Sequence, residues 1–302
     1  MTDVLIRAGS FVASILLGYV LKKVGLFRDA DFPILSNVVM KITFPAAIIT
    51  SLNGRQIEPG MLVLLPLAFS CGLVYMLVAA LVNIRSTKEQ RAFDILNLPG
   101  YNIGNFSMPF VQSFLGPMGV IAAGIFDMGN AMITLGTAYG VASAVKSGAK
   151  FSVKRIFKAF STSVPLITYM SMLLLSLLHI RLPAPVTEFT GIIGNANPFL
   201  AMFMIGVGFK LSGDKSQVRK IAQILGLRYG IAVVIALAFW FLLPFGVEVR
   251  QALVMLAFSP MAAAIPPFTA ELGEDVGLSS AINSVAILCG VISNVIVLAV
   301  LL

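Results

Sequence analysis

The stretch NLPGYNIGNFSMPFVQSFLG, from Asn97 to Gly116, carries the residues best suited to binding chemistry in a strongly apolar chain. Proline removes a backbone donor and glycine relaxes the backbone, so we expect the helix here to break. A break exposes helix ends, whose amides attract anions and whose carbonyls attract cations or donors. The polar and small positions in this predicted substrate site are Asn102, Gly104, Asn105 and Ser107.

A second stretch, SPMAAAIPPFTAELG, repeats this pattern nearer the C-terminus, and Pro109 corresponds there to Pro266. Ser259 is the one polar side chain at this second break, and with Met261 it is expected to join the substrate site. The prolines expected to break and cross the two helices are Pro99, Pro109, Pro260 and Pro266. The plainer alternative is that these prolines only kink packed helices, since proline is common in membrane spans.

Ionisable and amide side chains at membrane depth are further functional candidates. Asp127 and Asn130 lie one turn apart on the same helical face. Burial disfavours a charged carboxylate, so Asp127 could carry a coupling proton or bind Na⁺, or it could be a structural hydrogen-bonding residue. Asn283 and Ser284 could complete a cation site with Asp127, or only bridge helices.

Two cations are also expected inside spans. Lys41 could neutralise Asp127, attract a substrate carboxylate, or face a wet vestibule without a specific role. Arg228 is expected near the inner end of its helix, where its side chain could snorkel to the interface. Asn195 and Asn197, beside a mid-span proline, are candidate scaffold-side contacts or helix caps.

The elements that must position these residues are membrane helices. Hydrophobic residues make up 58% of the 302 residues and charged residues only 11%, where a soluble domain has about 25% charged residues. We predict an all-α polytopic membrane protein with ten transmembrane helices. Their expected positions are 3–21, 33–52, 60–83, 92–115, 118–142, 158–179, 185–209, 221–243, 251–271 and 277–301.

The basic residues predict the orientation of these helices. With the N-terminus outside, the outer side holds Arg7, Arg55, Arg181 and Arg250. The inner side then holds Lys22, Lys23, Arg28, Arg85, Lys88, Arg91, Lys146, Lys150, Lys154, Arg155, Lys158, Lys210, Lys215, Arg219 and Lys220. Since inner loops are enriched in Lys and Arg, both termini are expected on the non-cytoplasmic side of the cell's inner (plasma) membrane.

The basic loop after the fifth helix divides the chain into five helices plus five. An odd number per half inverts the second half, so we expect inverted repeats over residues 1–145 and 146–302. Pro45 and Pro198 are placed mid-span in corresponding helices. Helices 4 and 9, broken in corresponding places, are expected to cross near the midplane, where secondary transporters of this kind bind substrate.

The spacing of Asn102, Gly104 and Pro109, with Pro45 in the second helix, resembles the auxin efflux carrier family. The resemblance implies a bacterial-type, PIN-like elevator fold, an architecture shared with the bile-acid sodium symporters. Helices 1, 2, 6 and 7 would form a scaffold, and helices 3–5 and 8–10 a moving transport domain. Two departures from the family pattern are the doubled proline without an amide in the ninth helix, and Lys41.

The resemblance implies secondary transport of a small organic anion, such as a mono- or dicarboxylate. Alternatives are a sodium-coupled bile-acid-type symporter and an anion channel. An enzyme is not expected, because no nucleophile with a base is present, and we expect no cofactor except Na⁺ as a coupling ion, and no nucleic-acid partner. The substrate, the direction of transport, the coupling ion and the oligomeric state, with a homodimer among the options, are not determined by the sequence.

Overall fold

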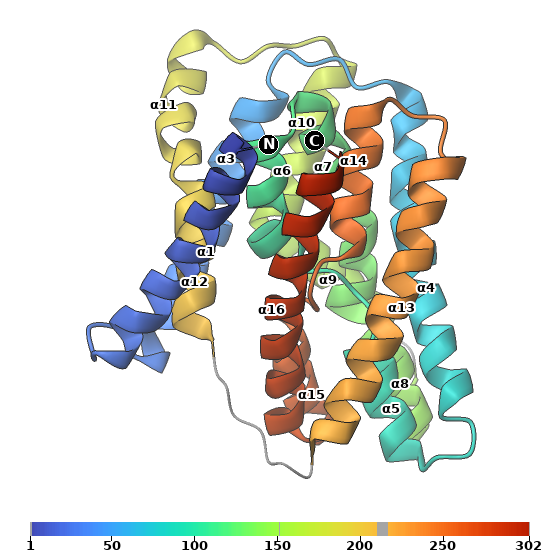
Figure 1. Ribbon diagram of the computed structural model, residues 1–302. Coiled ribbons are helices and arrows are strands. Elements are labelled where there is room, and N and C mark those ends of the chain that lie inside the picture. Colours follow the sequence, from blue (N-terminus) through green and yellow to red (C-terminus); the bar gives the residue numbers. More distant parts are fainter. Residues whose placement is uncertain (1, 151, 210–216, 302) are drawn as a thin grey trace.

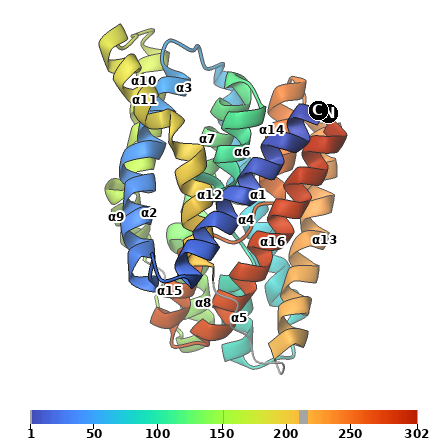
Figure 2. The ribbon, with the colours of Figure 1, turned by 60° about the vertical axis from the view of Figure 1, so that its left-hand side comes forward.

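The computed structural model describes residues 2–150, 152–209 and 217–301, and the predicted inner cations Lys210 and Lys215 lie outside them. In these ranges every regular element is helical, and no strand occurs. The two ends of the chain lie close together at one end of the bundle (Figures 1 and 2), which we call the terminal end. The opposite end is called the far end.

The α-helices follow one another along the chain, with short 3₁₀ helices at η1 (Asp29–Asp31) and η3 (Pro59–Val63). Those of the first half are α1 (Thr2–Lys23), α2 (Phe32–Val38), α3 (Phe44–Leu52), α4 (Leu64–Val82), α5 (Lys88–Asn97), α6 (Met108–Phe114), α7 (Pro117–Met132) and α8 (Ala138–Ser147). Those of the second half are α9 (Val153–Thr162), α10 (Val164–Leu177), α11 (Ala184–Asn195), α12 (Asn197–Gly208), α13 (Val218–Leu242), α14 (Val247–Ala257), α15 (Ile265–Leu272) and α16 (Val276–Leu301). Wider π-helical turns are η2 (Val39–Thr43), η4 (Ile103–Ser107) and η5 (Ile133–Thr137).

Membrane-spanning length is reached by fewer helices than the ten predicted. Among the described residues, six helical segments are long and apolar enough to cross a membrane, and a seventh is added if α9 and α10, bent by 76°, count as one. The six are Asp29–Leu52, Pro59–Val82, Pro117–Ser147, Ala184–Gly208, Val218–Leu242 and Val276–Leu301. The fourth and ninth predicted helices are absent from this set because each is divided into two shorter helices, as the prolines predicted.

Pro45, in the second predicted helix, does not interrupt its helix. The segment from α2 to α3 stays helical, and the wide turn η2 ends at Thr43, two residues before Pro45. Proline lacks the amide that would bond to the carbonyl one turn earlier, and a π-type turn absorbs this mismatch. Pro198 near the start of α12 follows a short interruption at Ala196 between α11 and α12. Neither proline interrupts its helix as widely as those near residues 100 and 260.

The helices form two groups, judged by which helices pack together. The α1 group comprises α1, α2, η2, α3, α10, α11 and α12, in which α1 packs along α12 and α3 packs against α10 and α11. The α7 group comprises α4 to α8 and α13 to α16, in which α7 packs against α4 and α14, and α5 against α8. Each group draws helices from both halves of the chain, which Figure 2 shows as interleaved colours.

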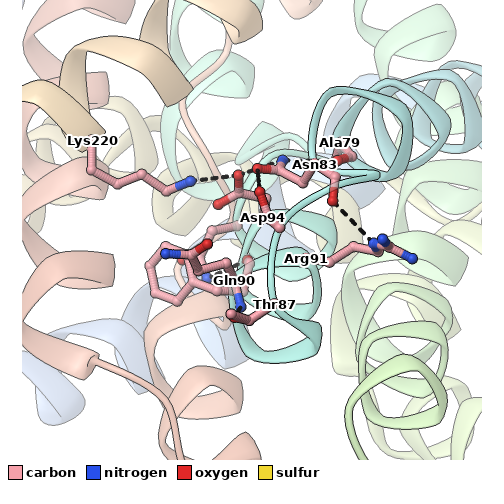
Figure 3. A network of polar contacts seen from close by, with 10 residues as sticks. Ala79, Asn83, Thr87, Gln90, Arg91, Asp94 and Lys220 are labelled. Atoms are coloured by element: carbon pink, nitrogen blue, oxygen red, sulfur yellow. Dashed lines mark hydrogen bonds and ion pairs between the residues drawn. The ribbon is translucent and has the colours of Figure 1, made fainter.

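A buried polar network ties α5, α4 and α13 together inside the α7 group (Figure 3). The Asp94 carboxylate, 3% exposed, accepts hydrogen bonds from Lys220 Nζ at 2.6 Å and from Asn83 Nδ2 at 2.7 Å. Arg91 Nε donates to the Asn83 carbonyl at 3.2 Å. These contacts fix α5 to its neighbours, so that α5 and α13 are held as one unit.

Backbone contact between α1 and α12 gives a stability prediction. A Cβ added at Gly206 would stand 2.0 Å from the Ile15 carbonyl oxygen, and one at Gly18 would stand 2.2 Å from that of Phe203. Because both neighbours are backbone, Gly206→Ala is expected to force the helices apart and destabilise the protein by about 1–3 kcal/mol. The measurement is thermal unfolding of the purified protein in detergent.

Gly226→Ala is the matched control for this change. Gly226 lies in α13, and a Cβ there would meet nothing within 4 Å. Alanine is better than glycine in a helix by about 0.5–1 kcal/mol, so this variant should be neutral or slightly more stable. Equal melting temperatures for the two variants would contradict the close packing of α1 on α12.

Candidate functional site

The first helix break runs from Leu98 to Asn102, between α5 and η4. Gly100 adopts φ +81°, the left-handed region that glycine enters without strain. A Cβ at this position would also stand 2.6 Å from the Thr134 side chain, so glycine is required for space as well as for conformation. Pro99 precedes it and supplies no amide hydrogen that would need a partner. The chain therefore leaves the helix sharply and re-enters it at Ile103.

The second break lies between the end of α14 at Ala257 and the start of α15 at Ile265. Pro260 stands within it, and Pro266 occupies the first turn of α15, where a missing amide hydrogen is tolerated. α5 and α15 lie toward the far end of the bundle and α6 and α14 toward the terminal end (Figure 1). The two broken helices therefore run in opposite directions.

The two breaks contact each other directly, at a place we call the crossover. The Asn102 amide donates to the Pro260 carbonyl oxygen at 2.9 Å. The hydroxyls of Ser107 and Ser259 are also hydrogen-bonded, and both side chains are fully buried. Gly290 in α16 leaves room for this contact, since a Cβ there would lie 3.1 Å from Pro260.

Arg228 holds the crossover together from one side, and the expectation that it snorkels to the interface is wrong. Its side chain is only 1% exposed and lies beside the crossover. Nη1 donates to the Leu98 carbonyl at 2.6 Å, and Nη2 donates to the carbonyls of Gly100 at 2.6 Å and Ser259 at 2.7 Å. The guanidinium also lies over the rings of Tyr75 and Tyr101. One side chain thereby satisfies carbonyls of both breaks, which a helix can no longer satisfy.

Asn130 holds the first break from the other side. Its Oδ1 accepts from the Tyr101 amide at 2.9 Å, and its Nδ2 donates to the Tyr101 carbonyl at 2.8 Å. The same Nδ2 donates to Asp127 Oδ1 at 3.1 Å. A side-chain amide that pairs with both polar groups of one residue acts like a neighbouring strand, and it keeps Tyr101 out of helical geometry.

Two cavities adjoin the crossover, and the side chains of Asn102 and Asn105 line both. The cavity of about 140 Å³ also contains Asp127 and Asn130. The cavity of about 230 Å³ contains Asn283, Ser284 and Pro266. Residues of the α1 group, Phe32 and Met204 in the larger cavity and Met40 in the smaller one, complete the walls. Both cavities thus lie between the two helix groups.

Asn105 lines both cavities and has an unpaired hydrogen-bonding atom. It is 8% exposed, and its Oδ1 has no hydrogen-bond partner among the described residues. A buried amide oxygen without a partner costs about 1–3 kcal/mol, so this acceptor marks a place where a hydrogen-bond donor of a ligand can be bound, while the Nδ2 of the same side chain is a donor.

Other predicted site residues lie elsewhere. Ser107, Ser259 and Met261 are fully buried and line neither cavity. Gly104 is the exception, since it lines the smaller cavity, and a Cβ there would stand 2.7 Å from the Phe44 ring. Lys41 is exposed and lines neither cavity. Asp127 does not share a cavity with Asn283 and Ser284, because the strip of chain carrying Asn102 and Asn105 lies between the two spaces.

A third cavity, of about 420 Å³, lies among α3, α6, α11 and α12. Asn195 lines it together with Gln112. Asn197 is fully buried beside it, where its Oδ1 accepts from the Thr43 hydroxyl at 3.0 Å and its Nδ2 donates to Gln112 Oε1 at 3.2 Å. The Asn197–Gln112 bond joins the α1 group to the α7 group.

Sequence reasoning missed the positioning role of Arg228 and the contact of Asn197 with Gln112. The signal for Arg228 was present, since an arginine deep in an apolar helix needs several acceptors. The helix breaks supply such acceptors, because two of the three carbonyls that it binds precede Pro99 and Pro260. Nothing in the sequence around Gln112 indicated its contact with Asn197, because the two residues are distant in the chain.

Apolar helices, paired helix breaks and cavities lined partly by amide side chains between two helix groups are typical of a membrane transporter. Residues 11–164 match the sequence pattern of the family described as "Membrane transport protein". The chain belongs to this family, the auxin efflux carrier family, as the sequence resemblance predicted. Its members are transporters and not enzymes. No curated protein matches the sequence.

Proposed function

We propose that the protein is a secondary transporter of a small organic anion, of the mono- or dicarboxylate class. The observation that carries the proposal is the crossover, where Asn102 and Asn105 face two cavities from a backbone held out of helical form. Carboxamide groups and first-turn amides of η4 and α15 are neutral donors, and such donors bind carboxylates without a full countercharge.

The proposed mechanism is elevator-type alternating access between the two helix groups. The α1 group would be the scaffold, and the α7 group, which carries the crossover, would move. Internal polar ties support this division, since Asp94, Arg228 and Asn130 all bind partners within the α7 group. Hydrogen bonds that join the groups, from Arg7 to the Ser113 carbonyl and from Asn197 to Gln112, both end on α6.

The inverted repeat belongs to the same proposal. Residues 1–145 and 146–302 would be the two five-helix repeats, and the opposite directions of the broken helices support this arrangement. Termini that lie together at one end are compatible with an even number of crossings, and we propose that both face the non-cytoplasmic side of the plasma membrane. Asp127 is the candidate for coupling to H⁺ or Na⁺, and Lys41 stays a prediction without a contact that supports it.

A ligand screen tests the function. The purified protein is heated in detergent with individual mono- and dicarboxylates, each with and without Na⁺ and at two pH values. Ligand at a hundred times its Kd stabilises the folded state by about 2.7 kcal/mol, which raises the melting temperature by several degrees. We expect a carboxylate to produce this shift. Stabilisation only by amines or neutral solutes would contradict an anion transporter, and flux that never saturates would indicate a channel.

A further inference from the structure

Two charged residues flank the crossover without touching each other, namely the buried Arg228 and the partly buried Asp127 at the wall of the smaller cavity. Arg228 contacts carbonyls and aromatic rings, and among the described residues no carboxylate lies within ion-pair distance of it. Asp127 accepts from Asn130 and likewise has no cation within that distance in the described chain. Isolated charges are costly in an apolar interior, so each charge needs compensation from some other direction.

A continuous series of hydrogen bonds connects the two charges. Arg228 Nη2 donates to the Gly100 carbonyl, and the same peptide unit donates its Tyr101 amide to Asn130 Oδ1. Asn130 Nδ2 then donates to Asp127 Oδ1. Every donor in this series points from the cation toward the carboxylate. Hydrogen bonds aligned in this way polarise one another in a low dielectric, so each charge stabilises the other through the series.

We propose that Arg228 and Asp127 form a compensated charge pair across the crossover, and that neutralising Asp127 is what allows the site to bind an anion. The inference rests on the proposed function, and it specifies how coupling would operate. With Asp127 ionised, the pair has no net charge and the cavity gains little attraction for a carboxylate. When H⁺ or Na⁺ neutralises Asp127, the fixed charge of Arg228 remains and favours an anion at Asn102 and Asn105.

The coupling between cation binding and anion binding is therefore positive. A cation at Asp127 and an anion at the crossover would each raise the affinity for the other, since linkage between two bound ligands is reciprocal. Such an arrangement moves cation and anion together, as a symporter does. Other titratable groups that face the pair are the phenols of Tyr169 on α10, Tyr75 on α4, Tyr229 on α13 and Tyr101.

A double-mutant cycle on stability, without any ligand, tests the pair. Melting temperatures are compared for wild type, Asp127→Asn, Arg228→Gln and the double variant. The double variant should lose at least about 3 °C less than the sum of the two single losses. Asn130→Ala interrupts the series while it leaves both charges in place. In the Asn130→Ala background, the difference between the sum of the two single losses and the loss of the double variant should fall by half or more. Additive losses would overturn the proposal.

The test includes one matched control and one replacement for a variant that does not fold. Asp127→Asn combined with Arg250→Gln is the matched control, because Arg250 contacts Trp240 outside the crossover, and these losses should add. If Arg228→Gln does not fold, Arg228→Lys replaces it. Lysine cannot make the three bonds of the guanidinium and loses the Nη2 bond to the Gly100 carbonyl with which the series begins, so in its cycle with Asp127→Asn the losses should again be non-additive. Additivity with lysine would also overturn the pair.

A binding measurement tests the consequence for the anion, with malonate as the probe and calorimetry as the readout. At pH 8 without Na⁺, Asp127→Asn should bind malonate at least about fivefold more tightly than wild type, and its affinity should no longer respond to Na⁺ or to acid. Weaker or equal binding by this variant would overturn the proposal. If neither protein binds malonate or any carboxylate in the screen, the proposed function fails, while the ligand-free cycle still decides the charge pair.

Discussion

Replacing Arg228 by methionine is expected to lower the melting temperature by about 10 °C and to abolish transport. Three carbonyls, those of Leu98, Gly100 and Ser259, would lose a charged donor in an environment without water. A hydrogen bond to a charged group contributes about 1.5–3 kcal/mol, so the three together account for a large part of the stability of one domain. Thermal unfolding in detergent and uptake into proteoliposomes are the two measurements.

Arg250→Met controls for the loss of an arginine as such. Arg250 donates to the Trp240 carbonyl at 3.0 Å and lies over the Trp240 ring, so methionine there removes contacts to a single residue. Its effect should be no more than about a third of that of Arg228→Met. A melting temperature for Arg228→Met within about 2 °C of wild type would show that the crossover holds without the guanidinium.

Changing Asn105 to aspartate is expected to weaken anion binding by at least about 100-fold while the protein stays folded. Aspartate has nearly the same shape as asparagine, and Asn105 lies where both cavities meet the crossover. A carboxylate there would face a carboxylate ligand, and like charges in contact cost several kcal/mol. Asn102→Ala and Asn105→Ala should each weaken binding by about tenfold to 100-fold, through loss of a donor alone. Calorimetry with the best carboxylate of the screen measures all three.

Gln90→Glu is the matched control, because it makes the same amide-to-carboxylate change in the same broken helix. Gln90 is exposed in the first turn of α5, remote from both cavities. The Gln90→Glu variant should bind the anion with the same affinity as wild type. Unchanged or tighter binding by Asn105→Asp would mean that the ligand at this site is not an anion, and the proposed substrate class would fall.

The helix breaks were the part of the site that the sequence predicted best. Pro99 with Gly100, and Pro260 with Pro266, are local signals, because a proline without an amide and a glycine with φ +81° act within one turn. The family followed from similarly local spacing, that of Asn102, Gly104 and Pro109. The number of membrane-spanning helices departs from the ten predicted partly for the same reason, since a break that signals a site also divides a helix.

The partners of the breaks could not be predicted in the same way. Arg228 lies more than 120 residues from Leu98 and Gly100, and no spacing rule connects them. The sequence marked Arg228 as an expensive charge but did not say which acceptors compensate it. It also grouped Asp127 with Asn283 and Ser284, whereas the packing of the chain at Asn102 and Asn105 places them in different cavities.

By itself, the sequence determined that the chain is a helical membrane protein of the auxin efflux carrier family and that two of its helices are interrupted. These properties follow from composition and from the conformations open to proline and glycine, which depend on neighbours along the chain. Only the tertiary structure decided that the interruptions meet, that Arg228 holds both of them and Asn130 the first, and that Asn105 keeps an unpaired oxygen at the cavities. Those contacts join α7 and α13 to the two breaks, and their geometry exists only once the helices are packed.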